Sequence, residues 1–340
     1  MTQERAGLRD VPRDVPRRAG VRRVAELAGV SPATVSRALR AGTPVSADTR
    51  ERVRRAALSA GYRLPARSLT VAVLARFPTR WFFAEAVAGV ESVLAAAGHL
   101  TQLHNVGDPA GRAHFFATLP VRGRVDGLIV VASALDDAER RALDDLGLPV
   151  TVVGGDMPGR PRIGIDDRAG ARAAVRHLAG LGHREIALVS FDPSEACGRT
   201  TTRDRRDGWA DALAESGIAP GPVLEVGADV AAGDAAAGRL LSLPHMPTAV
   251  FAMSDEAALG VIRTLRRAGI DVPGRVSVIG FDDHEMAAVA DLTTIAQPVR
   301  RQGELAARAL QAVVAGEEPA DVELPTRLVV RGTTAPPGRA

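Results

Sequence analysis

The sequence predicts a small helical domain at the N-terminus, followed by a larger α/β domain built on parallel sheets. Three observations lead to this prediction: two short helical patterns separated by a glycine turn, a strand–helix alternation that begins at Val71, and a reversal of net charge between these two parts. At 340 residues the chain is long enough to form two or three domains with separate cores.

The N-terminal end of the chain is basic, whereas the rest is acidic. Residues 1–67 contain 15 Arg against 6 Asp and Glu, and the remainder contains 28 Arg against 34 acidic residues. Such a distribution is expected when only one end of a protein meets a polyanion such as DNA. Residues 1–20 include tandem Asp-Val-Pro-Arg repeats without a helical or strand period, so we expect a disordered basic arm there.

Residues 21–63 show the pattern of a helix-turn-helix domain. Glycine tolerates the left-handed conformation, so Gly29 is expected to end the first helix; Ser31 caps the second, with Pro32 in its first turn. Apolar residues mark one face of each helix: Val24, Ala25, Leu27 and Ala28 on the first, and Val35, Ala38 and Leu39 on the second. The second helix of such a motif reads the DNA major groove. An ordinary pair of antiparallel helices is the alternative.

The composition gives no sign of export or of a membrane. No apolar run is long enough to cross a bilayer, and the Arg-rich N-terminus lacks the apolar stretch of a signal peptide. A single cysteine, Cys197, excludes an intrachain disulfide framework and fits a reducing compartment. We therefore expect a cytoplasmic protein without a membrane partner.

From Val71 onward, apolar strands alternate with Ala-rich helices, as in parallel α/β sheets. The expected strands are Val71–Ala75, Gly127–Ala132, Val150–Val153, Ile186–Ser190, Ala249–Ala252 and Val276–Phe281. The expected helices between them include Ala84–Ala97, Arg168–Leu181, Arg206–Ser216 and Glu256–Ala268. Ligands of such sheets bind beyond the carboxyl ends of the strands, and two such units facing each other would form a cleft for a small polar molecule.

Several motifs, in order along the chain, resemble the lactose-repressor-type (LacI) family of bacterial transcription regulators. They are Val24–Arg37, Val45–Val53, Ala60–Arg63, Val125–Ile129, Asp166–Gly170, Leu181–Ile186, Ser254–Gly260, Val276–Asp283 and Leu292–Ile295. The resemblance implies a DNA-binding headpiece, a hinge helix and a two-lobed core of the periplasmic-binding-protein type I fold, which dimerises and reads a palindromic operator in double-stranded DNA.

The resemblance also implies domain boundaries. The headpiece would span residues 21–63, a shortened hinge 64–70, and the core 71–335. Within the core, the first lobe would take about 71–165 and 295–318, and the second lobe about 166–292 and 320–333.

By position in the family, DNA contacts are expected from the second helix and from one hinge residue. These residues are Ser31, Pro32, Ala33, Thr34, Ser36, Arg37, Arg40 and Leu69. Pro32 and Ala33 have no side-chain donor or acceptor, so direct readout there reduces to apolar contact, such as Ala33 with a thymine methyl. The hydroxyl residues are candidates for phosphate or base contacts, and Arg37 for a guanine or phosphate contact. Solvated helix surface is the alternative for Thr34 and Ser36.

The hinge is shorter than in relatives of the family, because only Arg63–Thr70 separates Tyr62 from Val71. Leu69 stands at the position of an apolar wedge that kinks DNA from the minor groove. If half of the connector is helical and half extended, it spans about 19 Å. We expect either tighter coupling between headpiece and core, or a hinge that does not form and weaker or altered operator binding. Plain packing of Leu69 is the alternative.

In the core, the resemblance assigns five residues to an effector site: Phe82, Phe83, Arg205, Ser254 and Asp282. Arg205 would grip hydroxyls or carboxylates with its fork of donors, and Asp282 would accept hydrogen bonds from sugar hydroxyls. Phe82 and Phe83 would stack on a sugar ring, and Ser254 stands where Asn is common. The alternatives are lobe packing for the two Phe residues, an interlobe ion pair for Arg205 and a loop cap for Asp282.

Two positions depart from the sugar-binding members of the family. Gly154 replaces a frequent acidic residue, and Asp229 falls near a position that is often aromatic. These departures leave the chemical class of the effector open. Its identity, and whether it acts as inducer or corepressor, also stay open.

We therefore predict a homodimeric, sequence-specific DNA-binding regulator, a repressor, controlled by a sugar or related polar metabolite bound between the lobes. The alternative is a soluble sugar-binding sensor with weak or altered operator binding because of the short hinge. An exported solute-binding protein would lack the basic headpiece. An enzyme is disfavoured because no Ser/His/Asp set can be argued, and we expect no cofactor. Adjacent residues in Asp282–Glu285 point in different directions, so we expect no metal there.

Overall fold

The computed structural model describes residues 20–39, 45–60, 68–119, 125–155, 157–192 and 199–338. The chain divides into two compact units, Met1–Ser68 and Leu69–Ala340. The expected basic arm before Gly20, Arg40, most of the expected hinge and Cys197 lie outside the described residues.

The first unit contains the helices α1 (Val21–Ala28), α2 (Pro32–Ala38) and α3 (Ala47–Ser59). Gly29 ends α1 with φ 63°, and the Ser31 hydroxyl accepts the backbone N–H of Thr34 at 3.1 Å to cap α2, as the sequence predicts. Val24, Val35 and Val53, one from each helix, are fully buried in a common core.

One residue of the predicted apolar face of α1 is not part of this core. Leu27 is 47% exposed, whereas Val24, Ala25 and Ala28 are buried. At 3.6 residues per turn, Leu27 lies roughly 100° from the centre of the face formed by the other three residues. The helix therefore presents a narrower apolar face than the sequence suggested.

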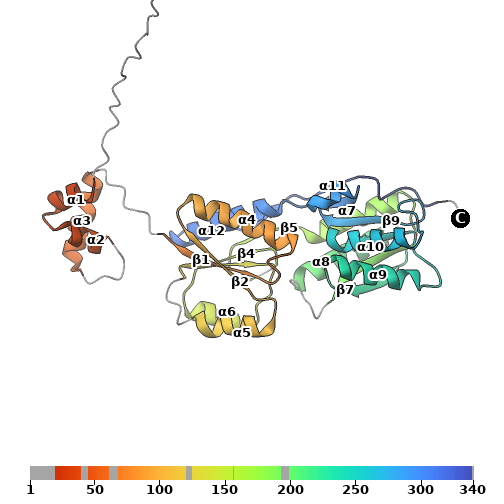
Figure 1. The fold of residues 1–340 in the computed structure, drawn as a ribbon, viewed down its shortest axis with the longest axis horizontal. Helices are drawn as coiled ribbons and strands as arrows, with labels where there is room; N and C mark the ends of the chain where they lie inside the picture. The colour runs from red at the N-terminus through yellow and green to blue at the C-terminus, as the bar shows by residue number, and fades with distance from the viewer. Residues whose placement is uncertain are drawn as a thin grey trace, which may run out of the picture. The chain divides into compact units, whose positions relative to one another are not determined.

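The first lobe of the second unit is built on a sheet of parallel strands in the order β11-β5-β4-β3-β1-β2. The strands are β1 (Thr70–Ala75), β2 (Leu100–Asn105), β3 (Gly127–Val131), β4 (Val150–Val153), β5 (Arg162–Ile165) and β11 (Val322–Leu324). Helices α4 (Trp81–Ala96) and α12 (Val299–Val314) cover one face, and α5 (Pro109–Thr118) and α6 (Asp137–Asp145) cover the other (Figure 1). Each face has its own apolar cluster.

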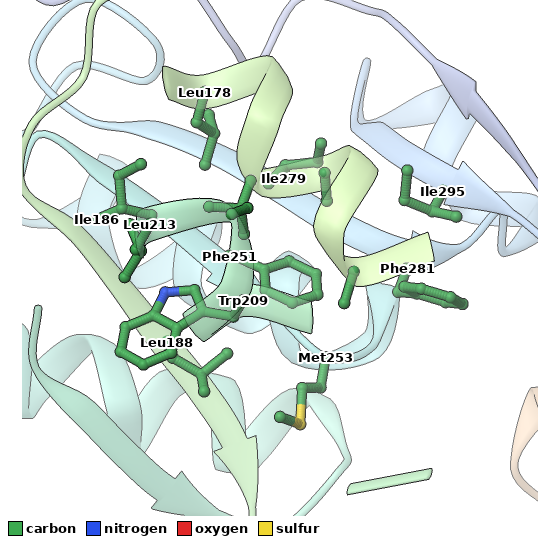
Figure 2. Close-up of a cluster of buried hydrophobic side chains, with 14 of the residues drawn as sticks. Leu178, Ile186, Leu188, Trp209, Leu213, Phe251, Met253, Ile279, Phe281 and Ile295 are labelled. Carbon is green, nitrogen blue, oxygen red and sulfur yellow. The ribbon is translucent and has the colours of Figure 1, made fainter. Parts of the chain in front are cut away.

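The second lobe repeats this architecture with the strand order β12-β10-β9-β8-β6-β7. Its strands are β6 (Ile186–Phe191), β7 (Val223–Val226), β8 (Ala249–Ala252), β9 (Ser277–Asp282), β10 (Thr293–Ala296) and β12 (Arg327–Val329), and only the β10–β12 pair among these described strands is antiparallel. Its helices are α7 (Asp167–Gly180), α8 (Arg199–Glu215), α9 (Val230–Leu241), α10 (Asp255–Arg267) and α11 (Glu285–Val289). Figure 2 shows the cluster between this sheet and α7–α8, with Trp209, Phe251 and Phe281 among its side chains.

The chain crosses between the lobes after β5, after β10 and after β11. Thr293–Ala296 pairs with β9 and so belongs to the second lobe, whereas Val322–Leu324 pairs with β5 and belongs to the first. The returning segment of the first lobe therefore extends from α12 to β11, a few residues later at both ends than the predicted 295–318.

Glycines bring α12 against α4 more closely than other residues would allow. A Cβ on Gly89 would lie 2.1 Å from the carbonyl oxygen of Arg300, and one on Gly303 would lie 2.0 Å from that of Ala86. The helix that returns to the first lobe is thus fixed against the helix that begins beside the cleft. In the part of the chain that the structure describes, no helix has both the length and the apolar character to cross a membrane.

Candidate functional site

The second helix of the headpiece presents most of its predicted DNA-contacting residues to solvent. Ser31, Pro32, Ala33, Ser36 and Arg37 are exposed, and Thr34 is half-buried. The hydroxyls of Ser31 and Thr34 lie 2.9 Å apart, and the Arg37 guanidinium reaches the Thr34 hydroxyl at 3.5 Å. Val35 turns the opposite way, into the core. The surface that these residues would present to a major groove is therefore small and polar, and Arg37 is the one basic residue among them.

The structure places Leu69 differently from the predicted wedge. Leu69 is the residue before β1, its side chain is 7% exposed, and it packs in the apolar cluster beneath α4 and α12. Its backbone N–H donates to His99 Nδ1 at 3.3 Å and its carbonyl accepts the N–H of Leu100 at 2.7 Å. In this structure Leu69 is a core residue just before the first strand of the sheet. Its burial is favourable because it removes a leucine side chain from water.

A cavity lies between the two lobes, at the carboxyl ends of their strands. The five predicted effector residues all line it: Phe82, Phe83, Arg205, Ser254 and Asp282. The remaining polar lining residues are Arg80, Asp167, Thr201, Glu256, Gln297 and Gln302. The residues predicted from the sequence therefore lie in one site, but six of its nine polar lining residues were not predicted.

Arg205 is the buried cation of this cavity. Its side chain is 5% exposed; Nε donates to Asp167 Oδ1 at 2.7 Å, and Nη1 donates to the carbonyl of Met253. Its guanidinium lies 3.6 Å from the ring centroid of Phe281. Asp167 begins α7 in the same lobe, so the ion pair is formed within the second lobe and not between the lobes.

Asp282 is held on the opposite side of Arg205 by a chain of amides. Its Oδ1 lies 3.7 Å from Arg205 Nη1 and accepts a hydrogen bond from Gln297 Nε2 at 2.6 Å. Gln297 Oε1 in turn accepts from Gln302 Nε2 at 2.9 Å. These three residues come from β9, from a crossover and from α12, so the chain of bonds runs from the second lobe to the first.

The backbone at the end of β9 is also unusual. Asp282 has φ 127° and Asp283 has φ 60°, conformations that non-glycine residues rarely adopt. Such strain is found mainly where a side chain must be aimed at a functional site. Here the strained residue Asp282 lines the cavity, and it is not the cap of α11, because His284 is.

Burial raises the pKa of the carboxyl groups in the cavity. The pKa of Asp282 rises to about 8, mainly because burial penalises its charge, although the nearby Arg205 acts in the other direction. Burial likewise raises the pKa of Asp167 above its ordinary value, against the effect of Arg205. A single guanidinium therefore serves two carboxyl groups, and the site has acceptor capacity left for a ligand with hydrogen-bond donors.

Ser254 and the two Phe residues form the rest of the predicted site. The Ser254 hydroxyl caps α10 by accepting the N–H of Ala257 at 3.2 Å and donates to the carbonyl of Ala228 at 3.1 Å. Phe83 is 4% exposed and belongs to the core of the first lobe, whereas Phe82 is half-buried and meets it edge-on at 5.4 Å between centroids. Phe82 is thus the ring with a face left for a ligand.

Of the two departures from the family pattern, Gly154 lines the cavity, and Asp229 pairs with Arg80, which lines it. Gly154 has φ 60°, and a Cβ built on it would lie 3.7 Å from the Phe82 ring. The glycine thus leaves open the space beside Phe82. Asp229 caps α9 by accepting the N–H of Ala232 at 2.8 Å, and its other oxygen pairs with Arg80 at 3.4 Å.

Comparisons with known proteins agree with this architecture. The family described as "Bacterial regulatory proteins, lacI family" matches residues 20–64, and the "Periplasmic binding protein-like domain" matches residues 175–334. The repressor PurR of Vibrio campbellii is 32% identical over 93% of this chain and 98% of its own length. The repressor CytR of Escherichia coli is 34% identical over 92% and 95%.

Solved structures give the same result. The complex of the transcriptional regulator CelR with cellobiose is 31% identical, with a TM-score of 0.70 over 93% of this chain and 100% of that chain. The lac repressor dimer bound to operator and the anti-inducer ONPF is 28% identical, with a TM-score of 0.71 over 94% and 100%. With relatives above 30% identity along almost its whole length, this chain belongs to the lacI family of bacterial regulatory proteins.

Proposed function

We propose that this chain is a transcription repressor that reads a palindromic operator as a homodimer and changes its DNA affinity when a small polar molecule binds between the lobes. The observation that carries the proposal is the presence in one chain of a helix-turn-helix with an exposed second helix and a cavity built around a buried arginine. The family supplies the regulatory role, and the two sites supply its two ligands.

For DNA, we propose that the exposed start of α2 enters the major groove. Ala33 would contact a thymine methyl, and Arg37 would bind a guanine edge or a phosphate. Ser31, Thr34, Ser36 and Arg40 would add polar contacts. Two headpieces in a dimer would reach successive major grooves about 34 Å apart, which predicts a symmetric site.

For the effector, we propose a sugar or a related molecule with several hydroxyl groups. Asp282 and Arg205 would bind its polar edge, and the exposed face of Phe82 would pack on its apolar face. Ser254 already uses its hydroxyl in two hydrogen bonds and so would mainly shape the wall. The molecule would act by favouring one arrangement of the lobes over another.

Selection of bound duplexes from a random DNA pool, at two salt concentrations, tests the proposed DNA recognition. We expect a palindrome that persists at the higher salt concentration. Binding without enrichment, lost steeply with salt, would mean attraction to phosphates alone and would contradict sequence-specific binding.

A matched pair of variants separates direct contact of Arg37 with DNA from the effect of overall charge. Arg37→Ala should lower affinity for the selected site by about ten- to a hundredfold, as loss of a base contact does. Arg239→Ala removes the same charge from α9 in the core and should leave that affinity unchanged. Equal losses in both variants would show that Arg37 contributes only charge.

A further inference from the structure

Two residues at the start of α4 reach from the first lobe to the second at the edge of the cavity. Arg80 and Trp81 come from the first lobe, and Asp229, Glu256 and His284 meet them from the second. We call these five residues the clasp. None of them is a binding residue predicted from the sequence, and Arg80 and Glu256 also line the cavity.

The first contact of the clasp is an ion pair. Arg80 Nη2 lies 3.4 Å from Asp229 Oδ2, with the arginine side chain 20% exposed and the aspartate 50% exposed. The Arg80 guanidinium also lies 4.4 Å from the ring centroid of Phe77, which holds it in place from its own lobe. Since Asp229 also caps α9, the acid is fixed on the second lobe.

Two further contacts involve Trp81. The Glu256 carboxylate lies close enough to the backbone N–H of Trp81 and to Arg80 for both to favour its charged form. The Trp81 ring lies 5.2 Å from the imidazole of His284, inclined by 38°. The clasp therefore combines an ion pair, a carboxylate beside a backbone N–H and a ring contact, and each of them joins one lobe to the other.

We propose that the clasp holds the two lobes together across the cavity, so that access to the effector site requires the contacts of Arg80 with Asp229 and of Trp81 with Glu256 to open. This inference rests on the proposed effector role of the cavity. A partly exposed ion pair is weak and screened by salt, so the clasp is a reversible closure that ionic strength loosens.

Hydrogen exchange of the Trp81 amide in the full chain, without ligand or DNA, tests this inference. When opening is faster than exchange, the exchange rate is proportional to the opening equilibrium even where the open form is rare. Asp229→Asn removes the charge but retains the helix cap, since Asn is an equally good capping residue. We expect exchange at Trp81 to accelerate about two- to fivefold, the size of effect of one exposed ion pair.

Asp234→Asn is the matched control. Asp234 lies on the same helix and pairs with Arg263 inside the second lobe, so its loss should leave Trp81 exchange unchanged. Raising the salt concentration should accelerate exchange in the wild type and much less in Asp229→Asn. Glu256→Gln removes the negative charge beside the Trp81 N–H and should accelerate Trp81 exchange at both salt concentrations.

Unchanged Trp81 exchange in Asp229→Asn, or equal acceleration in Asp234→Asn, would overturn the clasp. Because this readout uses neither DNA nor effector, such a result would leave the proposed repressor function standing. Failure of the DNA selection would in turn leave the clasp standing.

Discussion

Arg205 places a positive charge almost out of contact with water and depends on two carboxyl groups to remain there. Asp167 accepts from its Nε, Asp282 lies 3.7 Å from its Nη1, and the Phe281 ring covers its face. Removing one partner of a buried pair is costly because the other charge is left without compensation. The same arginine that is proposed to bind the effector therefore also stabilises the second lobe.

Arg205→Leu should accordingly lower the free energy of unfolding by about 3 kcal/mol, through the buried Asp167 that it leaves unpaired. Urea unfolding followed by circular dichroism measures this loss. Arg168→Leu is the control, because the Arg168–Asp211 pair is largely exposed, at 54% and 35%, and should cost less than about 1 kcal/mol. Similar losses in both variants would contradict the structural role of Arg205.

Asp282 should make stability depend on pH. Its pKa is raised from 3.8 to about 8 in the folded chain, so the folded state keeps a proton that the unfolded state has lost. The stabilisation that this retained proton provides is complete below about pH 4 and disappears as the pH rises to about 8. Over that range the free energy of unfolding falls by up to about 1.4 kcal/mol per pH unit. Asp282→Asn removes this titration, so its unfolding free energy should fall less steeply over that range.

Unfolding curves at several pH values check this difference between the two proteins. Asp211→Asn serves as control: the Arg168 pair lowers the pKa of Asp211, so its titration acts below about pH 4. Its curve should be parallel to that of the wild type between pH 4 and 8. An Asp282→Asn curve that is also parallel would mean that Asp282 is ionised in the folded chain.

The site residues that could be predicted from the sequence are those whose position matches a binding position of the family. The family resemblance assigns Arg205 and Asp282 to the effector site, and both line the cavity as expected. Gln297 and Gln302 were missed, because an amide becomes part of the site only where a crossover brings it beside Asp282. Glu256 was missed because its role depends on Trp81 from the other lobe.

At the scale of elements, the contact between α4 and α12 joins the start of the core to its returning segment. Gly303→Ala should destabilise the chain by about 1–3 kcal/mol, because the added methyl group would meet the carbonyl oxygen of Ala86 at 2.0 Å. Gly238→Ala on the exposed side of α9 meets no atom within 4 Å and should stabilise by about 0.5–1 kcal/mol. Thermal unfolding of both variants decides the matter, and effects of the same sign would contradict this packing.

The predicted strands that were buried and apolar all appear in the sheets. β2 was missed because Leu100–Asn105 is an edge strand with mostly exposed or half-buried residues and no apolar run. β11 and β12 have three residues each, too short for any periodicity to show. Helix α8 begins at Arg199, earlier than the predicted Arg206, because the threonines in its first turn resemble a loop in composition.

At the scale of the molecule, the two-lobed core could be predicted only from the family resemblance. The alternation of strands and helices indicated parallel sheets. Hydrogen bonding between strands that are distant in the sequence, however, decides which lobe a short strand joins. Thr293–Ala296 joins β9, and this shifted the predicted boundary of the first lobe. The expected hinge lies mostly outside the described residues, and Leu69 itself is part of the core.

If the cleft controls DNA binding, a molecule bound in it must change operator affinity, and this coupling between the two sites can be measured. Polar metabolites are first screened for thermal stabilisation of the wild type that is absent in Asp282→Asn. Affinity for the selected operator is then measured with and without each such compound. We predict a change of about 5- to 150-fold in the wild type, and none in Asp282→Asn. A compound that binds the cleft and leaves operator affinity unchanged would show that the cleft does not control DNA binding.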